Sequence, residues 1–339
     1  MDRSMQTPLA ILGQLSDGAI HSGTAIARDL GLSRTSIWKA LDRLRDDLGV
    51  EVVAVRGSGY RLPAPIEMFD QERIEAALSV QARRLISGIE LHATIDSTNS
   101  SLIKRINEDL GSGFVVIAEH QSGGRGRHGR SWVSPFGGGI LLSVFWRYAR
   151  GPFQLAGLSI AAGAAVATTL REWIGEELAL KWPNDILWRR RKLAGLLIDV
   201  VGEASGPSHV VVGLGVNLRL SQEMSAAIDQ PWVDLASIMG HGLPGRNQLA
   251  AALIGTLVEA LDRFDRDGLE AFLAAWECLD RYRGQPIMIR IGDRAINGIH
   301  AGIDEKGALR VLTKDGARLF QAGEVTLRAP EFGDEKGDW

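Results

Sequence analysis

Cysteine and net charge are both scarce in this sequence. Cys278 is the single cysteine among 339 residues, which excludes an intramolecular disulfide framework and indicates a reducing compartment. Its apolar neighbours on a helical segment predict a buried structural thiol. The formal net charge is only −3. Binding to nucleic acid would therefore need a local basic surface, because bulk positive charge is absent.

Long apolar runs are missing as well. The longest, residues 155–170, is rich in alanine and glycine and shorter than the ~20 residues of a membrane-spanning helix, so it predicts a packed internal helix. The sequence opens on no basic-then-apolar leader. We therefore expect a cytoplasmic protein without a membrane partner. With 45% hydrophobic and 23% charged residues, the composition is typical of a soluble chain of two or three domains.

Residues 1–65 have the pattern of a winged helix-turn-helix domain. The helix after the turn at 31–33 carries its apolar residues on one stripe, and a basic hairpin at 56–61 predicts the wing. Polar and basic residues on the opposite face of that helix and on the wing are expected to contact DNA: Arg34, Thr35, Ser36, Lys39, Arg43 and Arg56. The alternative is a winged helix that makes protein contacts.

Residues 66–280 predict one larger α+β domain. Strands are expected at 91–95, 113–119, 140–146, 178–182, 186–188, 192–200 and 209–217. Turns rather than crossover helices join the last four, so the sheet should be mostly antiparallel. Helices are expected at 70–85, 100–110, 155–173, 247–264 and 269–279. Residues 281–330 show short strands between glycine-containing turns, which predict an SH3-like β-barrel, and the polar tail from residue 329 should fray.

The loop 121–132 combines four glycines with three arginines and ends on Trp132. Glycine permits close approach of the backbone to a ligand, and arginine donates paired hydrogen bonds to phosphate or carboxylate oxygens. The loop therefore predicts a segment that becomes ordered around an anionic ligand. A solvated basic loop and a non-specific nucleic-acid contact are the alternatives.

Short polar motifs at predicted strand ends surround this loop. Residues 97–99 and Gln121 offer uncharged donors and acceptors that suit an amide or ureido group, although 97–99 taken alone more often begins a helix. Asp185 places a carboxylate at a turn, which could also be a simple hairpin. Gly213 and Gly215 leave room for a ligand, or mark a bulge or close strand packing.

Taken together, these motifs resemble the bifunctional biotin–protein ligase and biotin-operon repressor family over nearly the whole chain. The resemblance rests on GRGRHGR at 124–130, KWPND at 181–185, RKLAG at 191–195 and GLGVN at 213–217. Each motif is weak alone, whereas their order and spacing are specific. The family implies a class II synthetase-like central domain.

The resemblance also implies a two-step reaction. Biotin and ATP would form biotinyl-5′-adenylate and pyrophosphate, and the adenylate would acylate a lysine of a carboxylase carrier domain. Mg²⁺ would be carried mainly by the phosphates, because no dense carboxylate cluster offers a metal site. Positioning and charge stabilisation would then provide the catalysis.

Site residues follow from the same resemblance. Catalysis is assigned to Lys192, Arg125, Arg127 and Asp185. Biotin binding is assigned to Ser97, Thr98, Asn99, Gln121, Arg125, Gly126, Arg127, Lys192, Gly195 and Gly213, and adenylate binding to Arg130, Trp132 and Asn217. Three points stay open: whether Trp132 stacks on adenine or anchors the loop, whether Asp185 serves Mg²⁺ or the acceptor lysine, and whether His128 carries a charge.

The implied partners are a biotin carboxyl-carrier domain, operator DNA and a second copy of the chain once adenylate is bound. Two other functions stay open. A lipoate or octanoate ligase or transferase would share the catalytic architecture, and a repressor without enzymatic activity could sense a small acid.

Overall fold

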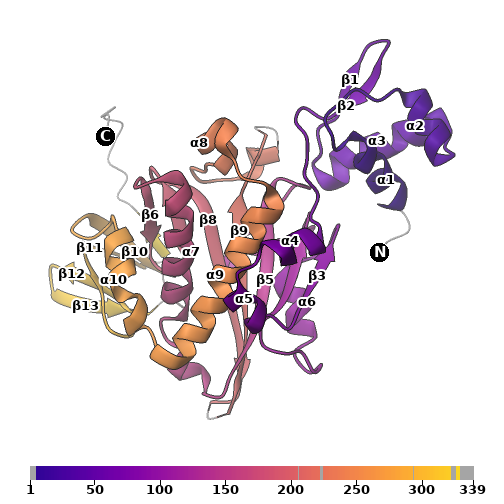
Figure 1. The fold of residues 1–339 in the computed structure, drawn as a ribbon. Helices are drawn as coiled ribbons and strands as arrows, with labels where there is room; N and C mark the ends of the chain where they lie inside the picture. The colour runs from indigo at the N-terminus through magenta and orange to yellow at the C-terminus, as the bar shows by residue number, and fades with distance from the viewer. Residues whose placement is uncertain (1–4, 205, 222–223, 293, 322–325, 329–339) are drawn as a thin grey trace.

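The computed structural model of this chain describes residues 5–204, 206–221, 224–292, 294–321 and 326–328. A small helical domain comes first, a seven-stranded sheet with its helices forms the centre, and a second, five-stranded sheet follows near the C-terminus (Figure 1). The tail from residue 329, predicted to fray, lies outside the described residues.

The first domain is a winged helix-turn-helix, as predicted. Its elements are α1 (Gln6–Leu15), α2 (Gly23–Leu30), α3 (Arg34–Leu48), β1 (Val53–Val55) and β2 (Gly59–Arg61). Ser33 begins α3, where its hydroxyl accepts a hydrogen bond from the Ser36 amide at 3.1 Å. The predicted apolar stripe of α3 is buried against α1 and α2.

The hydrophobic core of this domain also includes a residue from far along the chain. Phe136, which follows the glycine-arginine loop, is 3% exposed and packs in the same cluster as Leu44 and Leu48 of α3. Its amide donates to the Leu48 carbonyl at 2.9 Å. Packing of the winged helix therefore depends on a segment of the central domain, beyond the predicted residues 1–65.

The central sheet is mostly antiparallel, as predicted. Its strands lie in the order β3 (Gly88–His92), β4 (Phe114–Ala118), β5 (Gly139–Tyr148), β9 (Ser208–Asn217), β8 (Arg191–Gly202), β7 (Asp185–Trp188) and β6 (Leu178–Lys181). β3 and β4 are the parallel pair, since α6 (Thr98–Lys104) connects them as a crossover helix.

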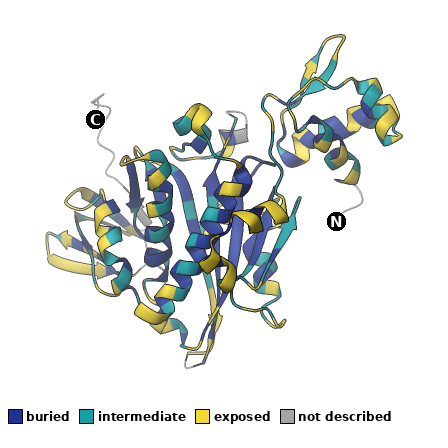
Figure 2. Ribbon diagram, in the orientation of Figure 1, coloured by how far each residue is buried: buried dark blue, intermediate teal, exposed yellow. Residues whose placement is uncertain are grey.

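Helices cover one face of the sheet, and Figure 2 shows the strands behind them as mostly buried. This layer contains α4 (Gln71–Ala77), α5 (Val80–Leu85), α7 (Leu158–Ile174), α9 (Arg246–Asp267) and α10 (Glu270–Leu279), with α8 (Leu235–Met239) near its edge. The continuous helix expected over 70–85 was wrong. Ser79 interrupts it and caps α5 by accepting from the Ala82 amide at 2.9 Å.

Pro152–Ile174, which contains α7, is long and apolar enough to cross a membrane by length and composition alone. In the folded chain α7 packs against α9, α10 and β6, and its alanines and leucines are largely buried. It is thus the internal helix that the sequence predicted.

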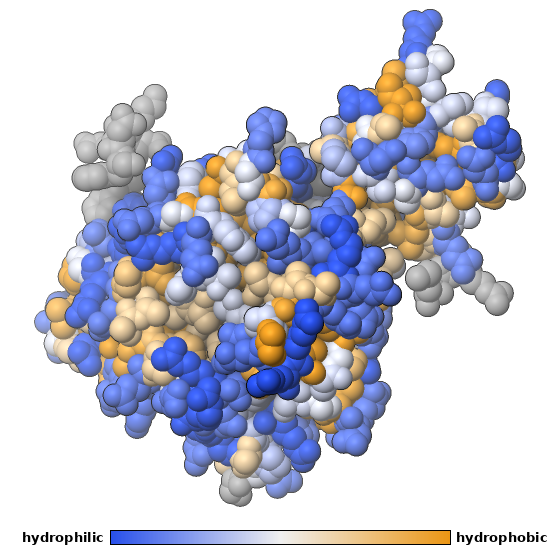
Figure 3. Space-filling model, in the orientation of Figure 1, coloured by the Kyte–Doolittle hydropathy of each residue, from blue (hydrophilic) through white to orange (hydrophobic). Residues whose placement is uncertain are grey.

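Figure 3 shows one face of the molecular surface, on which hydrophilic residues surround small groups of apolar residues.

The other face of the sheet is hollowed beside α6. Along β9, Val210, Val212 and Leu214 point into the main core, whereas Gly213 and Gly215 alternate with them. Glycines at these positions leave space where larger side chains would fill the surface. The glycine-arginine loop lies over this space.

The C-terminal strands form an antiparallel sheet of β10 (Pro286–Ile291), β11 (Arg294–Ile303), β12 (Leu309–Thr313), β13 (Gly316–Phe320) and β14 (Thr326–Arg328). Their order is β13-β12-β11-β10-β14. Nearby on α10, Cys278 is exposed and accepts from the Arg171 guanidinium at 3.2 Å. The predicted burial of this thiol was wrong, because it faces away from the side of α10 that buries Phe272, Trp276 and Leu279.

Candidate ligand-binding site

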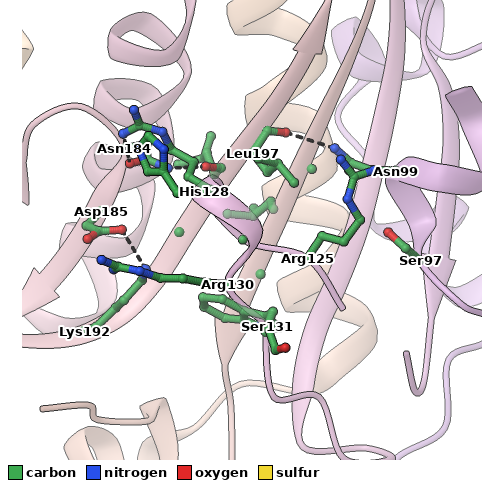
Figure 4. Close-up of a pocket in the computed structure, with 18 of the residues that line it drawn as sticks. Ser97, Asn99, Arg125, His128, Arg130, Ser131, Asn184, Asp185, Lys192 and Leu197 are labelled. Carbon is green, nitrogen blue, oxygen red and sulfur yellow. Dashed lines mark hydrogen bonds and ion pairs between the residues drawn. The ribbon is translucent and has the colours of Figure 1, made fainter. Parts of the chain in front are cut away.

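One cavity on the hollow face brings together nearly all of the predicted site residues (Figure 4). It is lined by the start of α6, the glycine-arginine loop, the β6–β7 turn and the middle of β8 and β9. The predicted residues that line it are Ser97, Thr98, Asn99, Gln121, Arg125, Gly126, Arg127, Arg130, Trp132, Asp185, Lys192, Gly195 and Gly213.

Asn217 is the exception among the predicted adenylate residues. Its side chain is 6% exposed and does not line the cavity. The amide nitrogen instead donates to the carbonyls of Lys192, at 3.3 Å, and Val233, at 3.1 Å. Asn217 thus braces the backbone of Lys192 from the side, because both amide hydrogens point to main-chain carbonyls.

One end of the cavity consists of uncharged groups. Ser97 begins α6 by accepting from the Ser100 amide at 3.4 Å, so its hydroxyl acts as a helix cap. At the first residue of α6, the Thr98 amide and hydroxyl both donate to Gln121 Oε1, at 2.7 and 3.1 Å. These contacts fix the side-chain amide of Gln121 at the lining of the cavity.

Asn99 crosses the hollow to the neighbouring strands. Its Nδ2 donates to the Leu197 carbonyl at 3.1 Å and to Asp199 Oδ2 at 2.9 Å. A Cβ on Gly213 would overlap Asn99 Oδ1. Glycine is needed at 213 because any side chain would displace this amide.

Ser143 in the middle of β5 completes the uncharged end. Its hydroxyl is fully buried and lies 2.7 Å from Thr98 Oγ1 and 2.5 Å from Asn99 Oδ1. With the contact between Thr98 Oγ1 and Gln121 Oε1, the network has three oxygen–oxygen contacts. Only two hydroxyl protons, those of Ser143 and Thr98, are available for them. At least one oxygen of the network can therefore accept a further hydrogen bond, which suits a ligand with N–H donors.

The other end of the cavity is charged. Lys192 Nζ lies 2.7 Å from Asp185 Oδ1, and their side chains are 17% and 20% exposed. Figure 4 shows this pair facing the cavity from β8 and β7. The carboxylate of Asp185 offsets the cost of partly burying the Lys192 ammonium, so the pair keeps a cation beside the glycine-arginine loop.

The glycine-arginine loop adds Arg125 and Arg127 to the lining of the cavity. Arg125 donates to Ser100 Oγ at 3.3 Å and lies 3.6 Å from Asp199 Oδ1. Arg127 donates to Asn184 Oδ1 at 3.4 Å. Burial lowers the pKa of Arg127, and the nearby charge of Asp185 opposes this shift. The long contact of Arg125 with Asp199, beside the cavity, suits a side chain that can also bind an anionic ligand.

The loop itself folds through backbone hydrogen bonds. Gly126 donates to the Arg130 carbonyl at 2.7 Å, and a short 3₁₀ turn at Arg127–Gly129 lies between them. His128 in this turn has a φ of 55°. Burial together with Arg127 and Arg130 lowers the pKa of His128, so the imidazole is neutral at pH 7 and adds no cation.

Trp132 anchors the loop on the sheet. An added Cβ on Gly215 would lie 2.6 Å from Trp132 Cε2, and one on Gly195 would lie 3.4 Å from Cζ3. Lys192 Nζ lies 5.5 Å from the centre of the indole ring, over its face. The indole is thus one wall of the cavity, and the two glycines make the space for it.

Three residues that were not among the predicted site residues belong to the site. Ser143 is a single hydroxyl within the apolar run of β5, and Asp199 is a single carboxylate within the apolar part of β8. A lone polar residue in such a run is the signal that could have identified them. Asn184, within the predicted 181–185 motif, is a third, since it donates to the Leu196 carbonyl and accepts from Arg127.

The predicted DNA contacts lie far from the cavity along the chain. Arg34, Thr35, Lys39 and Arg56 are exposed, and Ser36 is half-buried. Arg43 is half-buried, and its guanidinium donates to Asp47 at 2.8 Å and to Met5 Sδ at 2.9 Å. Its contact with DNA stays a prediction, as do the others.

Comparisons with known families agree with this arrangement. Residues 91–217 match the biotin/lipoate A/B protein ligase family, residues 9–61 match an HTH domain, and residues 283–328 match the biotin protein ligase C-terminal domain. The five strands that contribute to the lining of the cavity, β5 to β9, all lie within the first of these matches.

Individual relatives extend the likeness to the whole chain. The bifunctional ligase/repressor BirA of Escherichia coli is 40% identical over 96% of this chain and 98% of its own length. The biotin–[acetyl-CoA-carboxylase] ligase of Paracoccus denitrificans is 34% identical over 69% of this chain and 98% of its own. The biotin protein ligase of Aquifex aeolicus, solved in complex with biotin and ATP, superimposes with a TM-score of 0.60 at 26% identity over 72% of this chain and 100% of its own. The chain therefore belongs to the family of bifunctional biotin protein ligases and repressors.

Proposed function

We propose that this protein is a biotin–protein ligase that also represses transcription. It joins biotin and ATP to biotinyl-5′-adenylate with release of pyrophosphate, and then transfers biotin to a lysine of a carboxyl-carrier domain. The N-terminal winged helix-turn-helix binds operator DNA of biotin synthesis genes.

The cavity with two unlike ends is the observation that supports this function most. Thr98, Asn99, Gln121 and Ser143 provide a buried, uncharged network that matches a ureido ring system. Lys192 and Arg127 lie at the other end, where the carboxylate of the same ligand would meet a phosphate, and Arg125 lies between the two ends beside Asn99 and Asp199. A neutral head and an anionic tail are the two halves of biotin.

The roles of individual residues follow from their positions. Lys192, Arg125 and Arg127 hold the biotin carboxylate beside the α-phosphate, where they reduce the repulsion between two anions. Ser97 and Gly126 shape the biotin end of the cavity, and Gly195 and Gly213 line it through their backbone. No protein nucleophile is needed, because the carboxylate attacks phosphorus directly.

Arg130 and Trp132 serve the adenylate, and Asp185 orients Lys192. Because Asp185 Oδ1 already pairs with Lys192, its second oxygen is the one that could receive a proton from the acceptor lysine. A Mg²⁺ ion bound to ATP would neutralise phosphate charge. The described residues contain no group of three or more histidine, cysteine or acidic side chains that could hold a metal, so the ion would arrive with its nucleotide.

Regulation in this proposal links ligand and partner. Adenylate orders the glycine-arginine loop, and two copies of the chain then pair through the central sheet and bind a two-fold operator. Ordering a glycine-rich loop costs entropy that ligand and partner can share, which couples their binding. We further propose that the five C-terminal strands close as an SH3-like barrel and that the protein works in the cytoplasm.

Transfer of labelled biotin to a purified carrier domain, with ATP and Mg²⁺, tests the enzymatic function. We expect label on the carrier lysine and release of pyrophosphate, with little competition from lipoate or octanoate. Competition by either acid at equal concentration would assign the cavity to the lipoate side of the matched family. Binding of biotin without pyrophosphate release would leave a repressor without catalysis.

Sedimentation tests the regulatory part. We expect the monomer–dimer equilibrium to shift to dimer when biotin and ATP are added, because the adenylate forms in the cavity. The same equilibrium with and without these ligands would contradict adenylate-dependent pairing, and leave the ligase function untouched.

A further inference from the structure

An aromatic side chain on α3 has no packing role in its domain. Trp38 is 61% exposed, although α3 buries Ile37, Leu41 and Leu44 next to it. A tryptophan normally contributes through a large buried area, and this indole leaves most of its area accessible on the helix that follows the turn. The side chain is therefore available to a partner outside the domain, and its neighbours have to indicate which one.

The neighbours of Trp38 point to the chemistry of that partner. Trp38 follows Arg34 by four residues, which places them on the same side of the helix one turn apart, and Thr35 and Lys39 are exposed beside them. Cations on both sides favour a polyanion over a protein, since lysine is depleted in protein–protein interfaces.

The second half of α3 has the opposite character. Arg45 lies 2.9 Å from Asp46 and 3.3 Å from Asp42, so its charge is already compensated there. Asp47 likewise pairs with Arg43. The first turns of α3 thus offer uncompensated cations together with an apolar ring, and the last turns do not.

We propose that Trp38 is a specificity-determining residue that contacts the C5-methyl group of a thymine in the major groove of DNA. This inference rests on the DNA-binding half of the proposed function. The thymine methyl is the apolar group that the major groove displays, whereas Arg34 and Lys39 suit guanine edges or phosphates. Trp38 would then select sequence, and its cationic neighbours would supply affinity that does not depend on sequence.

The test uses the full-length protein with biotin and ATP, and a duplex enriched by this protein from a randomised pool. Each thymine of that duplex is replaced in turn by deoxyuridine, which lacks only the methyl group. For the unmodified protein we expect at least one replacement to weaken binding about fourfold, which is the effect of one buried methyl group. In Trp38→Ala the same replacement should have no effect, because the two changes remove one contact.

Two controls separate this contact from loss of folding. Trp38→Ala should bind the enriched duplex about tenfold more weakly, bind a scrambled duplex unchanged, and transfer biotin at the unmodified rate. Phe153→Ala removes another exposed aromatic, 84% exposed and outside the winged helix, and should change none of these.

Each other outcome decides against the inference. A deoxyuridine effect that persists in Trp38→Ala, or equal loss on enriched and scrambled duplexes, would overturn the thymine contact. Unchanged DNA binding by Trp38→Ala would assign the indole to a protein partner instead. Failure to enrich any duplex would overturn the repressor function itself, and this inference with it.

Discussion

The two ends of the cavity differ in charge and in how their side chains are held. At the uncharged end, Thr98, Asn99 and Ser143 are at most 3% exposed and hydrogen-bonded to one another. At the charged end, the side chains of Lys192 and Asp185 are 17% and 20% exposed, and Arg127 donates to Asn184 Oδ1 at the longer distance of 3.4 Å. One end is held by hydrogen bonds between neutral groups, and the other by an ion pair and longer contacts of charged side chains.

This difference follows from what each end has to bind. A neutral polar group brings little electrostatic attraction, so the protein must arrange its hydrogen-bond partners in advance and keep water away. Anions are attracted over longer distances, and long flexible arginines can close on them after they arrive. Changes at the charged end should therefore impair chemistry, and changes at the uncharged end should impair binding of biotin.

Lys192→Ala should have the largest effect. It removes the cation beside the reacting oxygens and leaves Asp185 unpaired, so we expect adenylate formation to slow about a hundred- to a thousandfold. Pyrophosphate release under saturating biotin measures this step. Arg263→Ala, which breaks an exposed pair with Asp267 on α9, is the matched control and should leave the rate unchanged.

A separate readout guards against misfolding. Lys192→Ala should keep the affinity for DNA that the unmodified protein shows without ligand, since α3 lies elsewhere in the fold. Equal loss of adenylate formation and of DNA binding would indicate misfolding, and would not support a role of Lys192 in catalysis.

Gly213→Ala should be next in size and act at the other end. The new Cβ would overlap Asn99 Oδ1, and overpacking of this kind costs ~1–3 kcal/mol. We expect KM for biotin to rise about ten- to a hundredfold, with a smaller change in kcat. Gly206→Ala is the control, because the nearest atom to its Cβ, Glu203 Cβ, is 3.4 Å away. An unchanged KM would show that the position of Asn99 does not matter for biotin.

Ser143→Ala should have a moderate effect of the same kind. Loss of one buried hydroxyl that serves the ligand network costs ~1–1.5 kcal/mol, so KM for biotin should rise about five- to tenfold. Ser208→Ala is the matched control on the paired strand β9. It loses an equally buried hydroxyl, which donates to the Arg150 carbonyl at 2.8 Å, and should lower the melting temperature without changing KM. Similar KM values for the two variants would contradict a role of Ser143 in binding.

His128→Asn should have the smallest effect, although it lies in the charged loop. Asparagine tolerates the positive φ, and the lowered pKa of His128 means that no charge is lost at neutral pH. KM for ATP should change less than about twofold, and its dependence on pH between 6.5 and 8 should match that of the unmodified protein. A KM that rises in the unmodified protein from pH 6.5 to 8, and does not in the variant, would show that the imidazole is a working cation.

Much of the fold could be predicted because its signals are local. The apolar stripe of α3, the caps at Ser33 and Asp70, and the turn residues of the C-terminal strands each act within a few positions of the chain. The single break at Ser79 was missed because apolar residues continue across it, while its cap hydrogen bond competes with the helix.

The candidate site was predicted less completely, for a reason that its residues make clear. Sequence motifs brought Thr98, Gln121, Lys192 and Gly213 to attention, and all of them line the cavity. Ser143 and Asp199 were missed, because their importance comes from Asn99, which lies 44 and 100 positions away from them. Asn217 was included on its motif, yet its amide faces the backbone.

By itself the sequence determined most of the helices and strands, the places of the glycines in β9 and the segments where cations gather, since periodicity and composition act along neighbouring residues. The tertiary structure alone decided that Phe136 completes the core of the winged helix, that Lys192 pairs with Asp185, and that Asn99 bridges α6 to β8. Such contacts depend on strand register and on the direction of side chains from separate elements. No local pattern encodes these directions, which is why the cavity acquires its two unlike ends only in the folded chain.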